Sequence, residues 1–167
     1  MHESDVNRLR KEIWRLALAA LDMRLVANTA QELMDGHDPS SVVETGLVVT
    51  YCRSFSGPPK DDRKPEHVVD ELAPVGDRLS LHTKLFEARN KLLAHTDEDY
   101  ASRRRTVDVF GNHSYKAEYP PKLRPEQLFP IRALALALAD RFSTAQKERE
   151  RVLREAGVEP EEWLRDE

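Results

Sequence analysis

The fold is decided by residues 5–34, which read DVNRLRKEIWRLALAALDMRLVANTAQELM. Apolar side chains recur there at alternating spacings of four and three residues, which is the period of an amphipathic α-helix. The first apolar stripe consists of Leu9, Ile13, Leu16, Ala20, Met23, Ala27, Ala30 and Met34. A second stripe, which we interpret as lying beside the first, consists of Trp14, Leu18, Leu21 and Leu25. Two neighbouring stripes predict a bundle helix that packs against two others and ends near Gly36.

Three further long helices are predicted, over residues 38–51, 77–95 and 129–156, and a short one over 66–72. The first of these starts at Asp38-Pro39, where aspartate can cap the helix and proline fits its first turn. Its β-branched residues would also suit a strand, but the start signal and the length favour a helix. The last helix begins with alternating alanine and leucine, both strong helix formers, and continues as a charged run.

Residues 105–119 change to a period of two around Gly111-Asn112, which predicts a β-hairpin before the last helix. A three-residue turn would set Asp108 opposite Lys116, and this register is favoured because it pairs opposite charges. The fold prediction is therefore a mainly α protein, an up-and-down bundle of four long helices with a small hairpin inserted. Residues 1–157 are expected to form one domain, followed by a C-terminal tail over 158–167.

Composition limits the kinds of protein that this chain can be. Its 167 residues are 40% hydrophobic and 34% charged, which suits one modest core in a charged shell. No apolar run approaches the roughly 20 residues that span a bilayer, and the single cysteine, Cys52, has no partner for an internal disulfide. We therefore expect a cytoplasmic protein without a membrane segment. The net charge of -4 disfavours a broad basic surface, so any RNA contact is expected to be local.

The aromatic residues are interpreted as structural. Trp14, Phe86 and Phe142 occur within apolar patterns and are predicted to lie in the core. Tyr51 and Phe55 are expected to border the loop that follows them, with no chemical role. The six histidines show no spacing typical of a zinc site, so neither a metal nor another cofactor is predicted.

The segment that could carry chemistry is EARNKLLAHTD, residues 87–97. On a continuous helix, Arg89 and His95 would lie about 120° apart around the axis and about 9 Å apart along it. Both would then flank the packed face and could converge on one cleft. An always-charged guanidinium stabilises charge on phosphate oxygens, and an imidazole transfers a proton near neutral pH. Metal-free RNA cleavage needs such a pair, because the ribose 2′-hydroxyl is itself the nucleophile.

This segment resembles the signature of the HEPN superfamily (higher eukaryotes and prokaryotes nucleotide-binding), with the match at Arg89, Asn90 and His95. The resemblance implies an α-helical bundle, a homodimer with two motifs facing each other across a cleft, and a metal-independent endoribonuclease. Such proteins occur in toxin–antitoxin and phage-defence systems, so RNA and a protein antitoxin are the implied partners. By the same analogy Arg89 and His95 are catalytic and Asn90 assists them. Many relatives have lost activity and serve as binding modules.

Basic residues near the motif are candidates for RNA contact: Lys91, Arg103, Arg104 and Arg105. A purely structural interpretation stays open beside each assignment. The arginine run may instead be a solvated charged surface, Arg89 may pair with an acid on another helix, and His95 may cap its own helix. The functional prediction is a HEPN-like ribonuclease. The alternatives are an inactive helical module that binds a nucleotide or protein, and a structural dimerisation domain.

Overall fold

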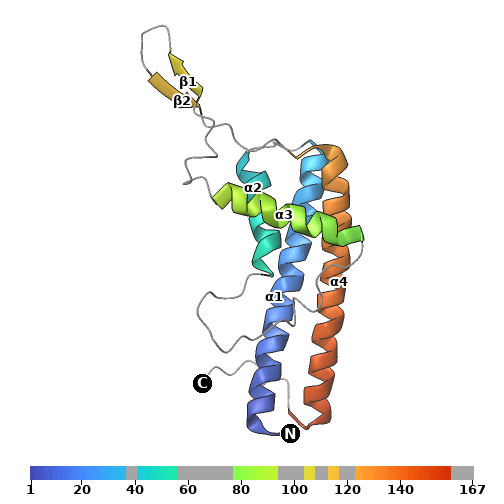
Figure 1. The fold of residues 1–167 in the computed structure, drawn as a ribbon. Helices are drawn as coiled ribbons and strands as arrows, with labels where there is room; N and C mark the ends of the chain where they lie inside the picture. Colours follow the sequence, from blue (N-terminus) through green and yellow to red (C-terminus); the bar gives the residue numbers. More distant parts are fainter. Residues whose placement is uncertain (37–40, 56–76, 94–103, 108–112, 117–122, 159–167) are drawn as a thin grey trace.

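The computed structural model describes residues 1–36, 41–55, 77–93, 104–107, 113–116 and 123–158 (Figure 1). These residues form four helices, namely α1 (Glu3–Met34), α2 (Ser41–Arg53), α3 (Asp77–Leu93) and α4 (Pro125–Glu155). The prediction of a mainly helical protein is confirmed for this part of the chain. The α2 and α3 helices have 13 and 17 residues, against 32 for α1 and 31 for α4, and the predicted residues 38–40 and 94–95 lie outside the described ranges. The predicted short helix over 66–72 lies outside the described residues.

The helices α1 and α4 run antiparallel and form the long axis of the molecule (Figure 1). Two contacts between their side chains fix this direction. Arg24 on α1 donates a hydrogen bond to Ser143 on α4 over 3.0 Å. Nearer the other end, Arg149 on α4 donates to Glu12 on α1 over 3.3 Å. Low numbers on α1 therefore meet high numbers on α4, as in an up-and-down bundle.

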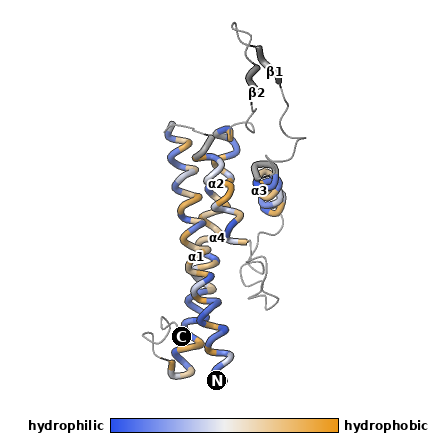
Figure 2. The backbone as a smooth tube through the Cα atoms, turned by 90° about the vertical axis from the view of Figure 1, so that its left-hand side faces the viewer, coloured by the Kyte–Doolittle hydropathy of each residue, from blue (hydrophilic) through white to orange (hydrophobic). Residues whose placement is uncertain are grey.

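The two shorter helices occupy one side of this pair. The α2 helix packs against α1, and α3 packs against α2. Figures 1 and 2 show that α3 lies across the other helices rather than along them. The antiparallel arrangement expected of an up-and-down bundle thus applies to α1 and α4, whereas α3 departs from it. The β-branched run of α2 is helical, which confirms the choice of helix over strand.

Helix ends follow local sequence. Gly36 and Gly157 have φ angles of 83° and 77°, a left-handed conformation that glycine adopts without strain, just beyond the ends of α1 and α4. The α4 helix begins at Pro125, four residues before the predicted start at Phe129. Proline fits this first helical position, and the Gln127 side chain accepts a hydrogen bond from the Arg124 backbone N–H over 2.9 Å.

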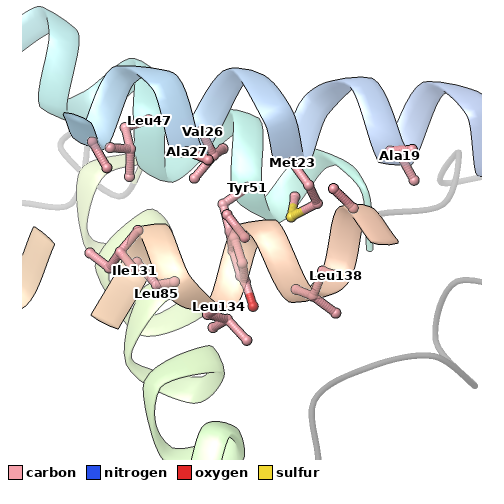
Figure 3. Packing of buried hydrophobic residues seen from close by; sticks show 14 of the residues in the cluster. Ala19, Met23, Val26, Ala27, Leu47, Tyr51, Leu85, Ile131, Leu134 and Leu138 are labelled. Carbon is pink, nitrogen blue, oxygen red and sulfur yellow. The ribbon is translucent and has the colours of Figure 1, made fainter. Parts of the chain in front are cut away.

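The main core lies where α1, α2, α3 and α4 meet. Figure 3 shows Met23 from α1, Tyr51 from α2 and Leu138 from α4 converging there. The first stripe of α1 contributes much of this core, since Leu16, Met23 and Ala30 are almost completely buried. Phe142 is buried as predicted, and Phe86 is partly buried against the same cluster. The alternating alanines and leucines of α4 therefore form a packed helix.

The second stripe of α1 was expected to pack beside the first, and this prediction is wrong. Trp14, Leu18, Leu21 and Leu25 are 60%, 46%, 60% and 51% exposed. Leu18 follows Leu16 by two residues, which is about 200° around a helix, so the two stripes face nearly opposite directions. Trp14 is consequently not a core residue. We call these four residues the outer stripe.

Two short strands, β1 (Arg104–Val107) and β2 (His113–Lys116), pair antiparallel between α3 and α4 in the chain. The register places Thr106 opposite Ser114 and Arg104 opposite Lys116. It therefore differs from the predicted register, in which Asp108 faces Lys116. The predicted turn at Gly111-Asn112 lies outside the described residues and stays a prediction.

None of the described helices contains a segment long and apolar enough to cross a bilayer.

Candidate functional site

Arg89 lies on α3 in a half-buried position, held by two near neighbours. Its guanidinium carbon stands 5.2 Å from the centre of the Phe86 ring, a cation–π arrangement. Its Nε and Nη2 atoms donate to Oδ1 of Asn90 over 3.3 Å and 3.1 Å. The amide of Asn90 thus helps to orient the guanidinium, whereas the part that the motif implies for Asn90 in catalysis stays a prediction.

A cluster of aromatic rings lies beside Arg89. His82, Phe86 and Arg89 follow one another at spacings of four and three residues, so they share one face of α3. The His82 and Phe86 rings are 4.9 Å apart between centres, and the Phe55 ring meets His82 edge-on at 4.8 Å. Phe55 also contacts Phe142 of α4 at 6.0 Å. The arginine therefore stands at the rim of an aromatic cluster that joins three segments of the chain.

His82 is the functional candidate that sequence reasoning missed. The hydroxyl of Tyr51 lies 2.9 Å from Nδ1 of His82, within hydrogen-bond distance. Burial raises the pKa of Tyr51, so its phenol stays neutral across the physiological range. A neutral phenol can donate to Nδ1 or accept from it, according to the imidazole tautomer. The spacing of His82, Phe86 and Arg89 was visible in the sequence, but the partner on α2 was not.

Cys52 lies beside this cluster and is buried. Its thiol donates a long hydrogen bond, 3.5 Å, to the backbone carbonyl of Leu85. Burial raises the pKa of the Cys52 thiol to about 11, and the positive charge of Arg89 partly opposes that shift. The charge of Arg89 therefore acts across the boundary between α2 and α3, yet it does not make the thiol reactive.

We expect Cys52 to react slowly with iodoacetamide in the folded protein. A pKa raised from 9.0 to about 11 leaves about a hundredfold less thiolate at pH 8, and burial slows access further. Because the folded state holds this proton more tightly than the unfolded state, the free energy of unfolding should fall as pH rises above about 9. Mass spectrometry of the alkylated protein measures the first effect.

The matched control is the same protein in denaturant, where the sole cysteine of the chain is exposed. Equal alkylation rates in the folded and unfolded protein would contradict the buried position of this thiol.

A second polar cluster joins α1 to the end of α2. Asp22 is buried on α1, and Arg53 donates to both of its carboxylate oxygens. The hydroxyl of Ser54 lies within 3.4 Å of the same carboxylate. The hydrogen bond to Asp22, followed by its charge, raises the pKa of Arg53. Arg53 therefore compensates the buried negative charge of Asp22, which is a structural role.

The other predicted site residues are only partly described. Lys91 lies in the last turn of α3, and Arg104 and Arg105 belong to β1. His95 and Arg103 lie outside the described residues. The structure therefore brings together Arg89 and Asn90, and the convergence of Arg89 with His95 stays a prediction. Within the described ranges, no three His, Cys, Asp or Glu side chains are grouped so as to hold a metal ion.

No protein-family model, curated protein or solved structure matches this chain. The functional argument therefore depends on the residues and geometry of the chain itself.

Proposed function

We propose that the chain is a HEPN-type, metal-independent endoribonuclease that serves in a toxin or phage-defence system. The observation that carries the proposal is the position of Arg89. Arg89 is half-buried as a residue, and its guanidinium lies against Asn90 and the Phe86 ring, which orient it. A pre-oriented cation loses little side-chain entropy when it binds a phosphate, so it is suited to stabilising a reacting phosphate group.

In the proposed reaction, the ribose 2′-hydroxyl attacks the adjacent phosphorus and the bond to the 5′-oxygen breaks. Arg89 stabilises the negative charge on the phosphate oxygens in the transition state. His95 accepts the 2′-hydroxyl proton or donates a proton to the leaving 5′-oxygen. The products are a 2′,3′-cyclic phosphate and a free 5′-hydroxyl. The reaction needs one group that accepts a proton and one that donates a proton. A homodimer in which two motifs face one cleft would supply both, because each copy contributes one His95.

The proposal extends to the binding partners. Lys91 and the run Arg103-Arg104-Arg105 would contact RNA phosphates close to the reacting group. A protein antitoxin would inhibit the enzyme, and its substrate would be RNA in the cytoplasm.

A second candidate is a catalytically inactive module that binds a nucleotide, and the ring cluster favours it. Phe55, His82 and Phe86 offer aromatic surface next to the guanidinium of Arg89. Rings and a cation placed together can take up a base and a phosphate without cleaving anything. For such a module, nucleotides should raise the melting temperature, and RNA should stay intact.

The deciding experiment is the cleavage of a mixed, end-labelled RNA pool in EDTA by wild type and by His95→Ala. We expect cleavage by wild type alone, with 2′,3′-cyclic phosphate ends and a pH–rate profile governed by an imidazole. Equal cleavage by the two proteins would refute the role of His95. No cleavage by either, together with nucleotide-dependent stabilisation, would favour the binding module.

A further inference from the structure

The outer stripe of α1 is an apolar surface that the described part of the chain leaves exposed. Its four side chains are 46–60% exposed, although all four are large and apolar. They recur at spacings of four, three and four residues, which is the repeat of helices that pack against one another lengthwise. The α4 helix packs against the side of α1 that carries Leu16 and Met23, nearly opposite the outer stripe.

The sequence of this surface is nearly symmetric about its midpoint. From the N-terminal end it reads Lys11, Trp14, Leu18, Leu21, Leu25, Asn28 and Glu32, each of them exposed. The four residues of the outer stripe have their midpoint between Leu18 and Leu21. An antiparallel second copy of α1 would therefore set Leu18 against Leu21 of the second copy, and Trp14 against its Leu25. A surface that matches itself under a two-fold rotation is what a symmetric dimer requires.

Charge favours the same arrangement. The stripe is flanked by basic Lys11 at one end and by acidic Glu32 at the other. In the antiparallel arrangement Lys11 faces Asn28 of the second copy and reaches its Glu32 one helical turn away. A parallel arrangement would instead place Lys11 against Lys11 and Glu32 against Glu32, which is unfavourable.

The size of the surface is also adequate. Lys11 to Glu32 spans about 32 Å of helix, at 1.5 Å per residue. A surface of that length, with the side chains that border it, can supply the roughly 800 Å² per partner of a standard interface. All four apolar side chains of the outer stripe are available to such an interface, and Trp14 and Leu21 are the most exposed, at 60% each.

We infer that the outer stripe is the contact surface of an antiparallel homodimer in which two copies of α1 pack against each other about a two-fold axis. This contact is separate from the proposed catalytic cleft. Arg89 lies on α3, which packs on α2, and α2 shares a core with Leu16 and Met23, on the face of α1 nearly opposite the outer stripe. The inference therefore does not depend on the proposed ribonuclease activity.

Sedimentation equilibrium of the full chain over a range of micromolar concentrations tests the dimer. We expect wild type to self-associate through the outer stripe, and Leu18→Glu/Leu21→Glu to raise the dissociation constant of that contact by at least about a hundredfold. The homodimer proposed for catalysis would be a second contact, which these two changes should leave intact. Because both leucines are exposed in the single chain, the variant should keep its helical circular dichroism. Lys147→Glu, an exposed change on α4, is the matched control and should leave the dimer intact.

A charge exchange tests the antiparallel direction. Lys11→Glu and Glu32→Lys should each weaken the dimer by about tenfold, and the double variant should restore it to nearly the wild-type dissociation constant. In a Trp163→Phe background Trp14 is the sole tryptophan of the chain, so its fluorescence should shift to shorter wavelength as the dimer forms.

Three results would overturn the inference. The first is a wild type that stays monomeric at about 100 μM, well above the dissociation constants typical of specific interfaces. The second is self-association that persists unchanged in Leu18→Glu/Leu21→Glu. The third is a monomer whose outer stripe binds anionic lipid vesicles instead. Arg89→Ala should leave sedimentation unchanged, so a failure of the ribonuclease proposal is recognised separately.

Discussion

Replacing Arg89 with alanine is expected to reduce the rate of RNA cleavage by about 10²–10³-fold, the usual cost of removing one group that stabilises charge in a transition state. The guanidinium is already oriented by Asn90. The fold should survive, because the change removes one half-buried cation–π contact worth about 0.5–1 kcal/mol. Single-turnover cleavage of labelled RNA in EDTA measures the effect, and thermal unfolding confirms the fold.

Two variants sharpen this prediction. Arg78→Ala removes an exposed arginine from the same helix and should leave the cleavage rate unchanged. Arg89→Lys keeps the charge but loses the planar fork that bonds Asn90, so we expect partial activity. An Arg89→Ala protein that cleaves RNA at the wild-type rate would rule out the proposed site.

Replacing Phe142 with alanine is expected to lower the free energy of unfolding by about 3–5 kcal/mol. Phe142 on α4 is completely buried, and its ring contacts Phe55 at 6.0 Å between centres. Truncation would leave a cavity where α4 meets the end of α2, and the long helices on either side restrict its collapse. A loss of this size is a large part of the total stability of a single domain. Urea unfolding followed by circular dichroism measures it.

The same helix provides the control. Phe129 is also a phenylalanine on α4, but 66% of it is exposed. We expect Phe129→Ala to change the free energy of unfolding by less than about 0.5 kcal/mol, as is usual for surface positions. Similar losses for the two variants would mean that Phe142 is not the packed residue described above.

Much of the fold could be predicted because helical period is a local property. The first stripe of α1 and the alternating leucines of α4 identified both long helices within a few residues of their ends. The outer stripe was misassigned because it was placed beside the first stripe, although the two-residue step from Leu16 to Leu18 already turns it about 200° away. Asp22 shows another limit, since a carboxylate is buried on α1 where Arg53 pairs with it, and helical period does not reveal that pairing.

The candidate site was predictable only in its local part. Arg89 and Asn90 are adjacent in sequence, and the structure joins them through hydrogen bonds. The bond between Tyr51 and His82 connects residues 31 positions apart and depends on how α2 meets α3. No periodicity in the sequence encodes how α2 packs against α3. A sequence-based reading therefore reached the arginine and missed the ring cluster that supports it.

The pairing of α1 with α4 has a consequence for the order of events during synthesis. These two helices lie at opposite ends of the described chain, and each supplies a large part of the buried core. In a nascent chain on the ribosome, the part of the apolar face of α1 that α4 covers thus stays exposed until residues 125–155 emerge. At about 5–20 residues per second, that interval lasts several seconds. During it, α1 is a natural target for chaperones that hold exposed apolar helices.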